Sequence, residues 1–205
     1  MLTGLYAITD TTLTPGGALI PAVAAALRGG ACIIQYRDKS HDAARRREEA
    51  AVLNALCKQH GALLIINDDV QLAADIGAAG VHLGRDDAGL HTARKRLGND
   101  AIIGVSCYNQ LTQAQTAAEQ GADYVAFGRF FPSLTKPDAL AATPELLRAA
   151  RHALTLPLVA IGGITPDNGG LLIDAGADML AVIHGVFGQL DIEAAARRFA
   201  QFFQR

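Results

Sequence analysis

The sequence has 205 residues, of which 50% are hydrophobic and 19% are charged, with a formal net charge of −2. This length and composition are typical of a compact globular protein with a large core, and they exclude a disordered chain. The small net charge gives no reason to expect nucleic acid or an anionic membrane as a partner, so an anionic ligand would need a local cluster of basic side chains.

Eight short apolar runs predict the strands. Four follow a break of small residues and lie within residues 28–37, 77–84, 119–128 and 174–183, and four more cover residues 5–9, 62–66, 101–105 and 158–161. Each run is almost continuous, without the alternation of a half-exposed strand. Continuous runs are typical of parallel strands that are covered on both faces.

Amphipathic stretches between these runs predict the helices. They cover residues 18–30, 41–61, 70–77, 90–97, 111–120, 143–153, 166–175 and 192–203. Thr143 and Thr165 each precede a proline and then an acidic residue, which is the expected start of a helix. Eight alternations of strand and helix predict a single (β/α)8 barrel domain over residues 1–205, with a doubly wound sheet as the alternative.

The cysteines and the apolar runs bear on the compartment. We expect no signal peptide and no membrane span, because every apolar run is far shorter than the roughly 20 residues that cross a bilayer. Cys32, Cys57 and Cys107 are scattered, without the close spacing of a disulfide or zinc framework. We therefore expect a cytoplasmic protein in which all three thiols are reduced, small and buried.

Polar residues gather where the predicted strands end. In chain order they are Thr9 and Asp10; Gln35, Arg37 and Lys39; Asn67, Asp68 and Asp69; Arg85, Asp86 and Asp87; Ser106; Ser133, Thr135 and Lys136; and His184. A (β/α)8 barrel carries its functional residues at this end of its strands. The rim formed by these residues is therefore the predicted site.

Two groups on this rim have alternative interpretations. Gln35, Arg37 and Lys39 alternate, so they are expected on one side of the chain, either converging on an anion or forming a solvated strand end. Asp68 and Asp87 leave neighbouring strands and either cap the following helices or, beside a basic patch, hold magnesium through carboxylate oxygens.

The later loops add hydroxyl groups, a lysine and a glycine pair. Ser133 and Thr135 supply two hydroxyl donors, and Lys136 supplies a third positive charge. Glycines 162 and 163 either let the backbone approach a phosphate, which barrels often bind beside strands seven and eight, or serve tight packing.

Seven segments together resemble the thiamine-phosphate synthase family. They are YAITD, QYRDK, IINDDVQLA, GVHLGRDD, IGVS, GADYVAFGRFFPSLTK and VAIGGIT, from about residue 5 to residue 183. The ordered set is specific although each segment alone is not. The resemblance implies a (β/α)8 barrel and a Mg²⁺-dependent transferase. Such an enzyme joins 4-amino-5-hydroxymethyl-2-methylpyrimidine diphosphate to a thiazole phosphate, with or without a 2-carboxy group, and releases pyrophosphate and thiamine phosphate.

The resemblance also implies roles for individual residues. Those matching the pyrimidine diphosphate site are Gln35, Arg37, Lys39, Asn67, Ser106 and Lys136, of which Arg37, Lys39, Ser106 and Lys136 are expected to act in catalysis. Asp68 and Asp87 match magnesium ligands. Those matching the thiazole phosphate site are Ser133, Thr135, Gly163, Ile183 and His184. The expected partners are therefore small phosphorylated molecules.

The sequence departs from the family pattern at Arg85, Tyr108, Ser133 and His184. Two alternatives stay open: a thiazole tautomerase of the same superfamily and a non-catalytic barrel that binds phosphate ligands. Asp68 with Asp87 favours the synthase, because proton transfer alone needs no metal pair. His82 lies inside a predicted strand, and we expect it to be a packed or hydrogen-bonded histidine, not a catalyst.

Overall fold

The strands form a closed parallel barrel. The computed structural model describes residues 2–84, 89–132 and 141–204. The strands are β1 (Gly4–Ile8), β2 (Ala31–Tyr36), β3 (Leu63–Asn67), β4 (Gly80–Leu83), β5 (Ile102–Tyr108), β6 (Tyr124–Gly128), β7 (Leu158–Ile161) and β8 (Met179–Val182). They pair in chain order, and β8 pairs with β1 to close the barrel. The predicted (β/α)8 barrel is confirmed, and the doubly wound alternative is wrong.

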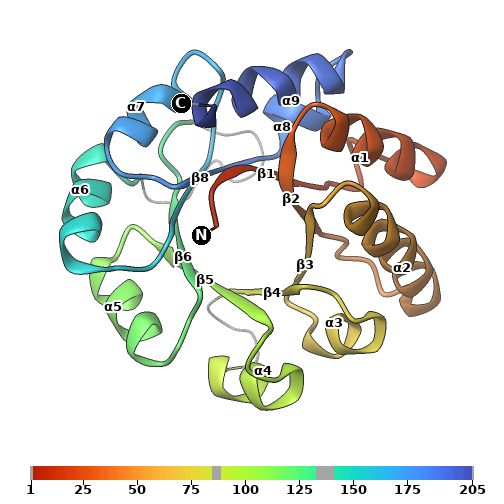
Figure 1. Cartoon of the computed structure of the whole chain (residues 1–205), viewed down its shortest axis with the longest axis horizontal. Helices are drawn as coiled ribbons and strands as arrows, with labels where there is room; N and C mark the ends of the chain where they lie inside the picture. Colours follow the sequence, from red (N-terminus) through yellow and green to blue (C-terminus); the bar gives the residue numbers. More distant parts are fainter. Residues whose placement is uncertain (1, 85–88, 133–140, 205) are drawn as a thin grey trace.

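The helices surround the barrel on its outside (Figure 1). They are α1 (Leu19–Arg28), α2 (Ala43–Gln59), α3 (Val70–Ile76), α4 (Leu90–Leu97), α5 (Leu111–Glu119), α6 (Pro144–Ala153), α7 (Gly169–Asp174), α8 (His184–Phe187) and α9 (Ile192–Ala200), with two 3-10 turns at Gly16–Ala18 and Gln201–Phe203. Helix α6 begins at Pro144 as predicted. Helix α7 begins at Gly169 instead of Pro166, because Asn168 Oδ1 accepts a hydrogen bond from the amide of Thr165 at 2.8 Å and holds a turn there.

Strand residues face two different cores. Along β1, Leu5 and Ala7 pack in the layer between strands and helices, whereas Tyr6 and Ile8 pack inside the barrel. This alternation buries both faces of the strands, since one face meets the helices and the other fills the barrel. It explains why the strands appear in the sequence as continuous apolar runs.

One expectation about the thiols is wrong. Cys57 and Cys107 are buried, but Cys32 is exposed. Pairing between β1 and β2 shifts at this point, with Leu5 opposite Ala31 and Tyr6 opposite Ile33, so Cys32 is an extra, bulged residue. Burial raises the pKa of both the Cys57 and the Cys107 thiol to about 12.

In the described part of the chain, none of the helices has both the length and the apolar character that a bilayer crossing requires.

Candidate functional site

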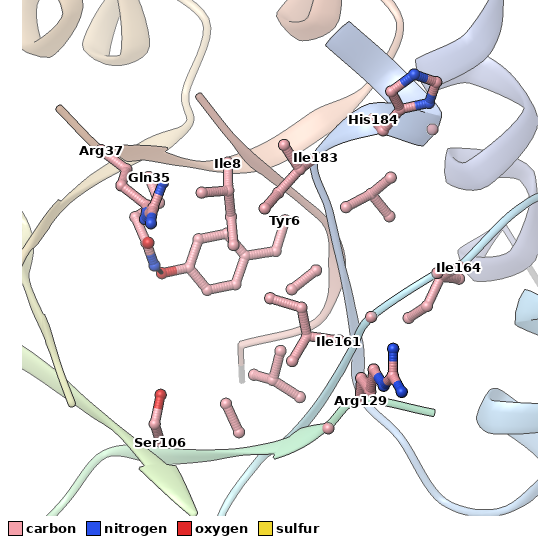
Figure 2. A pocket seen from close by; sticks show the side chains of 18 of the residues that line it. Tyr6, Ile8, Gln35, Arg37, Ser106, Arg129, Ile161, Ile164, Ile183 and His184 are labelled. Atoms are coloured by element: carbon pink, nitrogen blue, oxygen red, sulfur yellow. Dashed lines mark hydrogen bonds between the residues drawn. The ribbon is translucent and has the colours of Figure 1, made fainter. Parts of the chain in front are cut away.

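A cavity of about 400 Å³ opens at the carboxyl ends of the strands (Figure 2). Seven of the site residues that the family resemblance implies line it: Gln35, Arg37, Asn67, Ser106, Gly163, Ile183 and His184. On one side they come from β2 and the residue after it, from β3 and from β5, and on the other side from the loop after β7 and the start of α8 after β8. The barrel therefore brings together residues that lie up to about 150 positions apart in the chain.

Not every predicted residue contacts this cavity. Lys39 is exposed and is not among the residues that line it. Asp68 is not among the lining residues either; it is partly buried and directly follows Asn67, which lines the cavity. The predictions for Asp87, Ser133, Thr135 and Lys136 lie outside the described residues.

A chain of hydrogen bonds crosses the floor of the cavity. Gln35 Nε2 donates to the Tyr6 hydroxyl at 2.7 Å, and that hydroxyl lies 2.8 Å from the hydroxyl of Tyr124. The Tyr124 hydroxyl lies 3.0 Å from His82 Nδ1, and His82 Nε2 lies 2.9 Å from Ser106 Oγ. The expectation of a hydrogen-bonded His82 is confirmed. Its ring links the buried floor to the Ser106 hydroxyl at the rim.

The two tyrosines in this chain of hydrogen bonds, Tyr6 and Tyr124, stay protonated. Burial raises the pKa of Tyr6 above its usual range, and burial also raises that of Tyr124, helped by the neighbouring Tyr6. Both hydroxyls can therefore donate and accept hydrogen bonds, but neither can act as a base at neutral pH. The sequence analysis missed both residues. The available signal was a tyrosine inside a strand, because a buried tyrosine hydroxyl usually finds a polar partner.

Contacts between the ends of β1 and β2 hold Arg37. Its amide donates to Thr9 Oγ1 at 2.9 Å, and its guanidinium Nη1 lies 3.8 Å from Asp10 Oδ2. Burial opposes ionisation of Asp10, but hydrogen bonds from Thr12 and the charge of Arg37 hold its pKa below the ordinary value. Arg37 is thus a fixed positive charge on the cavity wall, with one carboxylate beside it.

Two acidic residues follow β3, and only the second of them, Asp69, caps the next helix. Asp69 is the N-cap of α3, because its Oδ1 accepts from the amide of Leu72 at 2.8 Å. Asp68 instead has a left-handed backbone with φ +65°, its amide donates to the carbonyl of His82 at 2.9 Å, and its Oδ2 accepts from Asn67 Nδ2 at 2.6 Å. A non-glycine residue in this conformation is uncommon, and such residues cluster at functional sites.

The donor set at this end of β3 suits a hard cation. Among the described residues, no group of three or more His, Cys, Asp or Glu side chains gathers to hold a metal alone. Mg²⁺ usually binds through one or two carboxylates together with water and substrate phosphates. A carboxylate from Asp68, beside a cavity lined by Arg37, has the chemistry that this mode of binding requires.

The glycine pair after β7 is required by packing. Gly162 and Gly163 have φ values of +105° and +62°, and a Cβ atom on Gly163 would lie 2.3 Å from the carbonyl oxygen of Pro132. The loop after β6 crosses directly over this pair, with the amide of Phe131 donating to the carbonyl of Gly162 at 3.0 Å. The tight-packing interpretation is confirmed, and both glycines also line the cavity.

The structure adds a cation that the sequence analysis did not select. Arg129 follows β6 and lines the cavity on the side of Ile161 and Ile164, across from Arg37 (Figure 2). The cavity therefore has an arginine on each of two opposite walls. Such an arrangement suits two separate anionic groups.

Comparison with known proteins identifies the family of this chain. The family model described as thiamine monophosphate synthase matches residues 5–186. Thiamine-phosphate synthase from Nitrosococcus oceani is 58% identical over 200 residues, which cover 98% of this chain and 92% of that protein. The corresponding protein from Alcanivorax borkumensis is 55% identical, with 99% and 95% covered.

Solved structures give the same result. A thiamine phosphate pyrophosphorylase from Pyrococcus furiosus is 34% identical and superimposes with a TM-score of 0.89, covering 98% of this chain and 95% of that one. A 3-hexulose-6-phosphate synthase shares only the fold, at 19% identity and a TM-score of 0.68, with 97% and 99% covered. From the family match and the close relatives, the chain belongs to the thiamine monophosphate synthase family.

Proposed function

We propose that the protein is a transferase that joins 4-amino-5-hydroxymethyl-2-methylpyrimidine diphosphate to a thiazole phosphate, releasing pyrophosphate and thiamine phosphate. The observation that carries the proposal is the two-sided cavity. Gln35, Arg37, Asn67 and Ser106 line one wall, and Gly163, Ile183 and His184 line the other. We assign the pyrimidine diphosphate to the first wall and the thiazole phosphate to the second.

In this proposal, catalysis consists of stabilising the leaving group. The bond between the pyrimidine methylene carbon and the diphosphate oxygen breaks, and the electron-rich aminopyrimidine stabilises the resulting cation until the thiazole nitrogen captures it. Arg37, which lines the cavity, stabilises the negative charge that grows on pyrophosphate. We assign the same role to Lys39, which is exposed outside the cavity, and to Lys136, which lies outside the described residues. Ser106 donates a hydrogen bond near the reacting oxygen, and His82 orients its hydroxyl.

We assign Mg²⁺ to Asp68 and Asp87, of which Asp87 lies outside the described residues. The ion, when bound, supplies positive charge that neutralises the diphosphate. Asn67 Nδ2, which donates to Asp68 Oδ2, holds that carboxylate in place. Hydrogen bonds to a metal-binding carboxylate commonly tune how tightly the metal is held.

The apolar walls have a separate role. Ile8, Val159 and Ile161 line the cavity between its two polar sides. These side chains exclude water from the region where the carbocation would form, which limits the reaction of the carbocation with water to give an alcohol. Binding both substrates in one cavity also places the attacking nitrogen next to the reacting carbon.

The test is pyrophosphate release by the purified protein with both substrates and Mg²⁺. The proposal predicts stoichiometric formation of thiamine phosphate and pyrophosphate, and it predicts none of either when one substrate is omitted. A thiazole tautomerase or a non-catalytic phosphate-binding barrel would release no pyrophosphate. Folded protein that releases none under these conditions would reject the proposal.

A further inference from the structure

Three consecutive arginines near the start of α2 have no role in the site described above. Each reaches a different carboxylate. Arg45 Nη2 lies 2.6 Å from Asp38 Oδ2, Arg46 Nη2 lies 2.8 Å from Asp69 Oδ2, and Arg47 Nη1 lies 3.3 Å from Asp75 Oδ2. Asp38 lies in the loop after β2, Asp69 in the loop after β3, and Asp75 in α3. The first two arginines therefore bind the two loops that carry candidate site residues, whereas the third does not.

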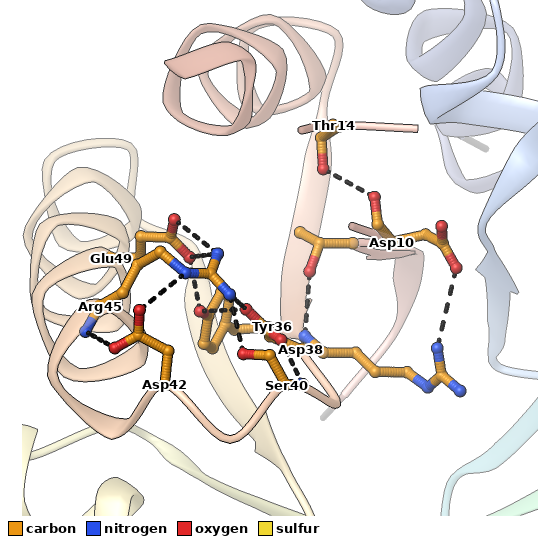
Figure 3. A network of polar contacts seen from close by, with 10 residues as sticks. Asp10, Thr14, Tyr36, Asp38, Ser40, Asp42, Arg45 and Glu49 are labelled. Carbon is orange, nitrogen blue, oxygen red and sulfur yellow. Dashed lines mark hydrogen bonds and ion pairs between the residues drawn. The ribbon is translucent and has the colours of Figure 1, made fainter. Parts of the chain in front are cut away.

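Arg45 fixes the loop between Arg37 and Lys39. The Asp38 side chain between those two residues has no exposed surface, and its Oδ1 accepts from the amide of Ser40 at 2.7 Å. Arg45 also donates to Ser40 Oγ at 2.8 Å and to Glu49 Oε1 at 3.2 Å (Figure 3).

The same contacts tie the loop to β2. The Tyr36 hydroxyl donates to Glu49 Oε2 at 2.6 Å, which anchors α2 to the last residue of the strand. Successive residues of an extended chain point to opposite sides, so anchoring Tyr36 and Asp38 on the α2 side turns Arg37 toward the cavity. Arg37 lines that cavity.

Arg46 fixes the turn that contains Asn67 and Asp68. Its partner Asp69 caps α3, and the amide of Asp69 donates to the carbonyl of Asn67 at 2.7 Å. The Arg46 side chain is 20% exposed, and its Nε is buried without a hydrogen-bond partner among the described residues. Leaving a polar atom buried in this way has a free-energy cost, so the position of Arg46 is a constraint of the packing and not a loose surface contact.

We propose that Arg45 and Arg46 are positioning residues that hold the cationic loop after β2 and the carboxylate turn after β3 in register, so that both act on one diphosphate–magnesium group. This inference rests on the proposed function, since it takes the ligand of that rim to be a diphosphate with its metal. Neighbouring arginines on one rigid helix set the spacing between the two loops. Neither guanidinium contacts the substrate in this role.

The chain offers a matched control for the test. Arg47→Ala removes the same kind of side chain from the same helix. The Arg47 side chain is 62% exposed, however, and ion pairs of such exposed side chains contribute little to stability. Arg45→Ala, Arg46→Ala and Arg47→Ala are compared with the wild type by calorimetric titration with Mg²⁺ and pyrophosphate, and by the KM for each substrate. Thermal unfolding of each variant shows whether the fold is retained.

We expect Arg45→Ala and Arg46→Ala to weaken binding of magnesium pyrophosphate about 10–100-fold, as loss of the residues that orient metal ligands does at metal sites. In these two variants the KM for the pyrimidine diphosphate should rise as well, while the KM for the thiazole phosphate stays within about twofold of wild type. For Arg47→Ala, all measured constants should stay within about twofold of wild type. Arg45→Lys keeps the charge but has no planar group to bridge Asp38, Ser40 and Glu49, so pyrophosphate affinity should fall there too, with the fold retained.

Unchanged pyrophosphate affinity in both alanine variants would overturn the inference. Equal rises in the two KM values would also overturn it, because they indicate general loosening of the barrel. Failure of the proposed function looks different: wild-type protein would then bind magnesium pyrophosphate and form no thiamine phosphate, and the titrations would still measure the positioning effect.

Discussion

The Ser106 hydroxyl lies 2.9 Å from Nε2 of His82, a residue of the neighbouring strand. The other nitrogen of the same ring lies 3.0 Å from the Tyr124 hydroxyl, and the two rings stack with centroids 5.6 Å apart. The imidazole is thus held on both sides. This arrangement fixes the direction of a hydroxyl that the proposed reaction places beside the leaving group.

Tyr124→Phe tests this link. The change removes the hydroxyl that lies between Tyr6 and His82, so that the Tyr6 hydroxyl and His82 Nδ1 each lose one hydrogen bond. We expect about 1–3 kcal/mol lower stability and about tenfold lower kcat, because an unsatisfied buried group costs that much and the Ser106 hydroxyl loses its fixed direction. Urea unfolding and steady-state kinetics measure the two effects. A kcat within twofold of wild type would show that the network does not serve catalysis.

Asp68→Ala tests the assignment of a metal ligand, and Lys136→Ala tests the assignment of a lysine that stabilises the leaving pyrophosphate. Removing one preorganised charge at a reacting group commonly lowers turnover about 10²–10³-fold, and we expect losses of that size with the fold intact. Circular dichroism and pyrophosphate release check the two parts of the prediction. Near-normal turnover in both variants would mean that these residues do not form the site.

Arg129→Ala tests the second cation of the cavity. Arg129 lies across from Arg37, on the side that we assign to the thiazole phosphate. We expect the KM for that substrate to rise about tenfold or more, since hydrogen bonds to charged groups contribute about 1.5–3 kcal/mol. Arg148→Ala, an exposed arginine on α6, is the control. An increase confined to the KM for the pyrimidine diphosphate would reverse the assignment of the two walls.

Gly163→Ala tests the packing of the loops after β6 and β7. The substitution combines a left-handed φ of +62° with a Cβ only 2.3 Å from the backbone oxygen of Pro132. We expect more than about 2 kcal/mol of destabilisation, because backbone strain and a steric clash with main chain add. Gly61→Ala, at φ +66° with open space around its Cβ position, should cost only about 1 kcal/mol. Equal effects in urea unfolding would contradict this explanation.

Asp38→Asn tests the loop anchor through the pH dependence of stability. Burial opposes ionisation of Asp38, but hydrogen bonds from Ser40 and the charge of Arg45 hold its pKa below the ordinary value of 3.8. A lowered folded-state pKa means that the carboxylate stabilises the fold above pH 3.8 and loses this contribution as the pH falls through the folded-state value. The variant should therefore be about 1–3 kcal/mol less stable at pH 7, with a smaller difference at pH 3. Urea unfolding at both pH values measures this difference in stability. A larger difference between variant and wild type at pH 3 than at pH 7 would contradict the prediction.

Much of the barrel could be predicted because burial on both faces leaves a direct trace in the sequence. Residues 158–161, for example, form an apolar run and appear as β7 with the predicted bounds. The four-residue helix α8 could not be predicted, since it is barely one turn long and has no measurable period. Its first residue, His184, was nevertheless recognised as a rim residue because it follows a strand.

The floor of the site was harder to predict than its rim. Whether Tyr6 points into the barrel depends on strand register, and the shift opposite Cys32 alters that register locally. Arg129 lies in a loop whose course depends on the glycine pair after β7, a contact between distant parts of the chain. Local patterns indicate which residues are polar, whereas tertiary packing decides which of them share a cavity.

The most direct test of the central claim is a crystal structure with Mg²⁺ and pyrophosphate bound. We expect the ion to bridge the pyrophosphate and the carboxylates of Asp68 and Asp87, with Arg37 on the phosphate oxygens from the opposite side. A pyrophosphate bound away from Arg37, with the two carboxylates turned from each other, would contradict the account.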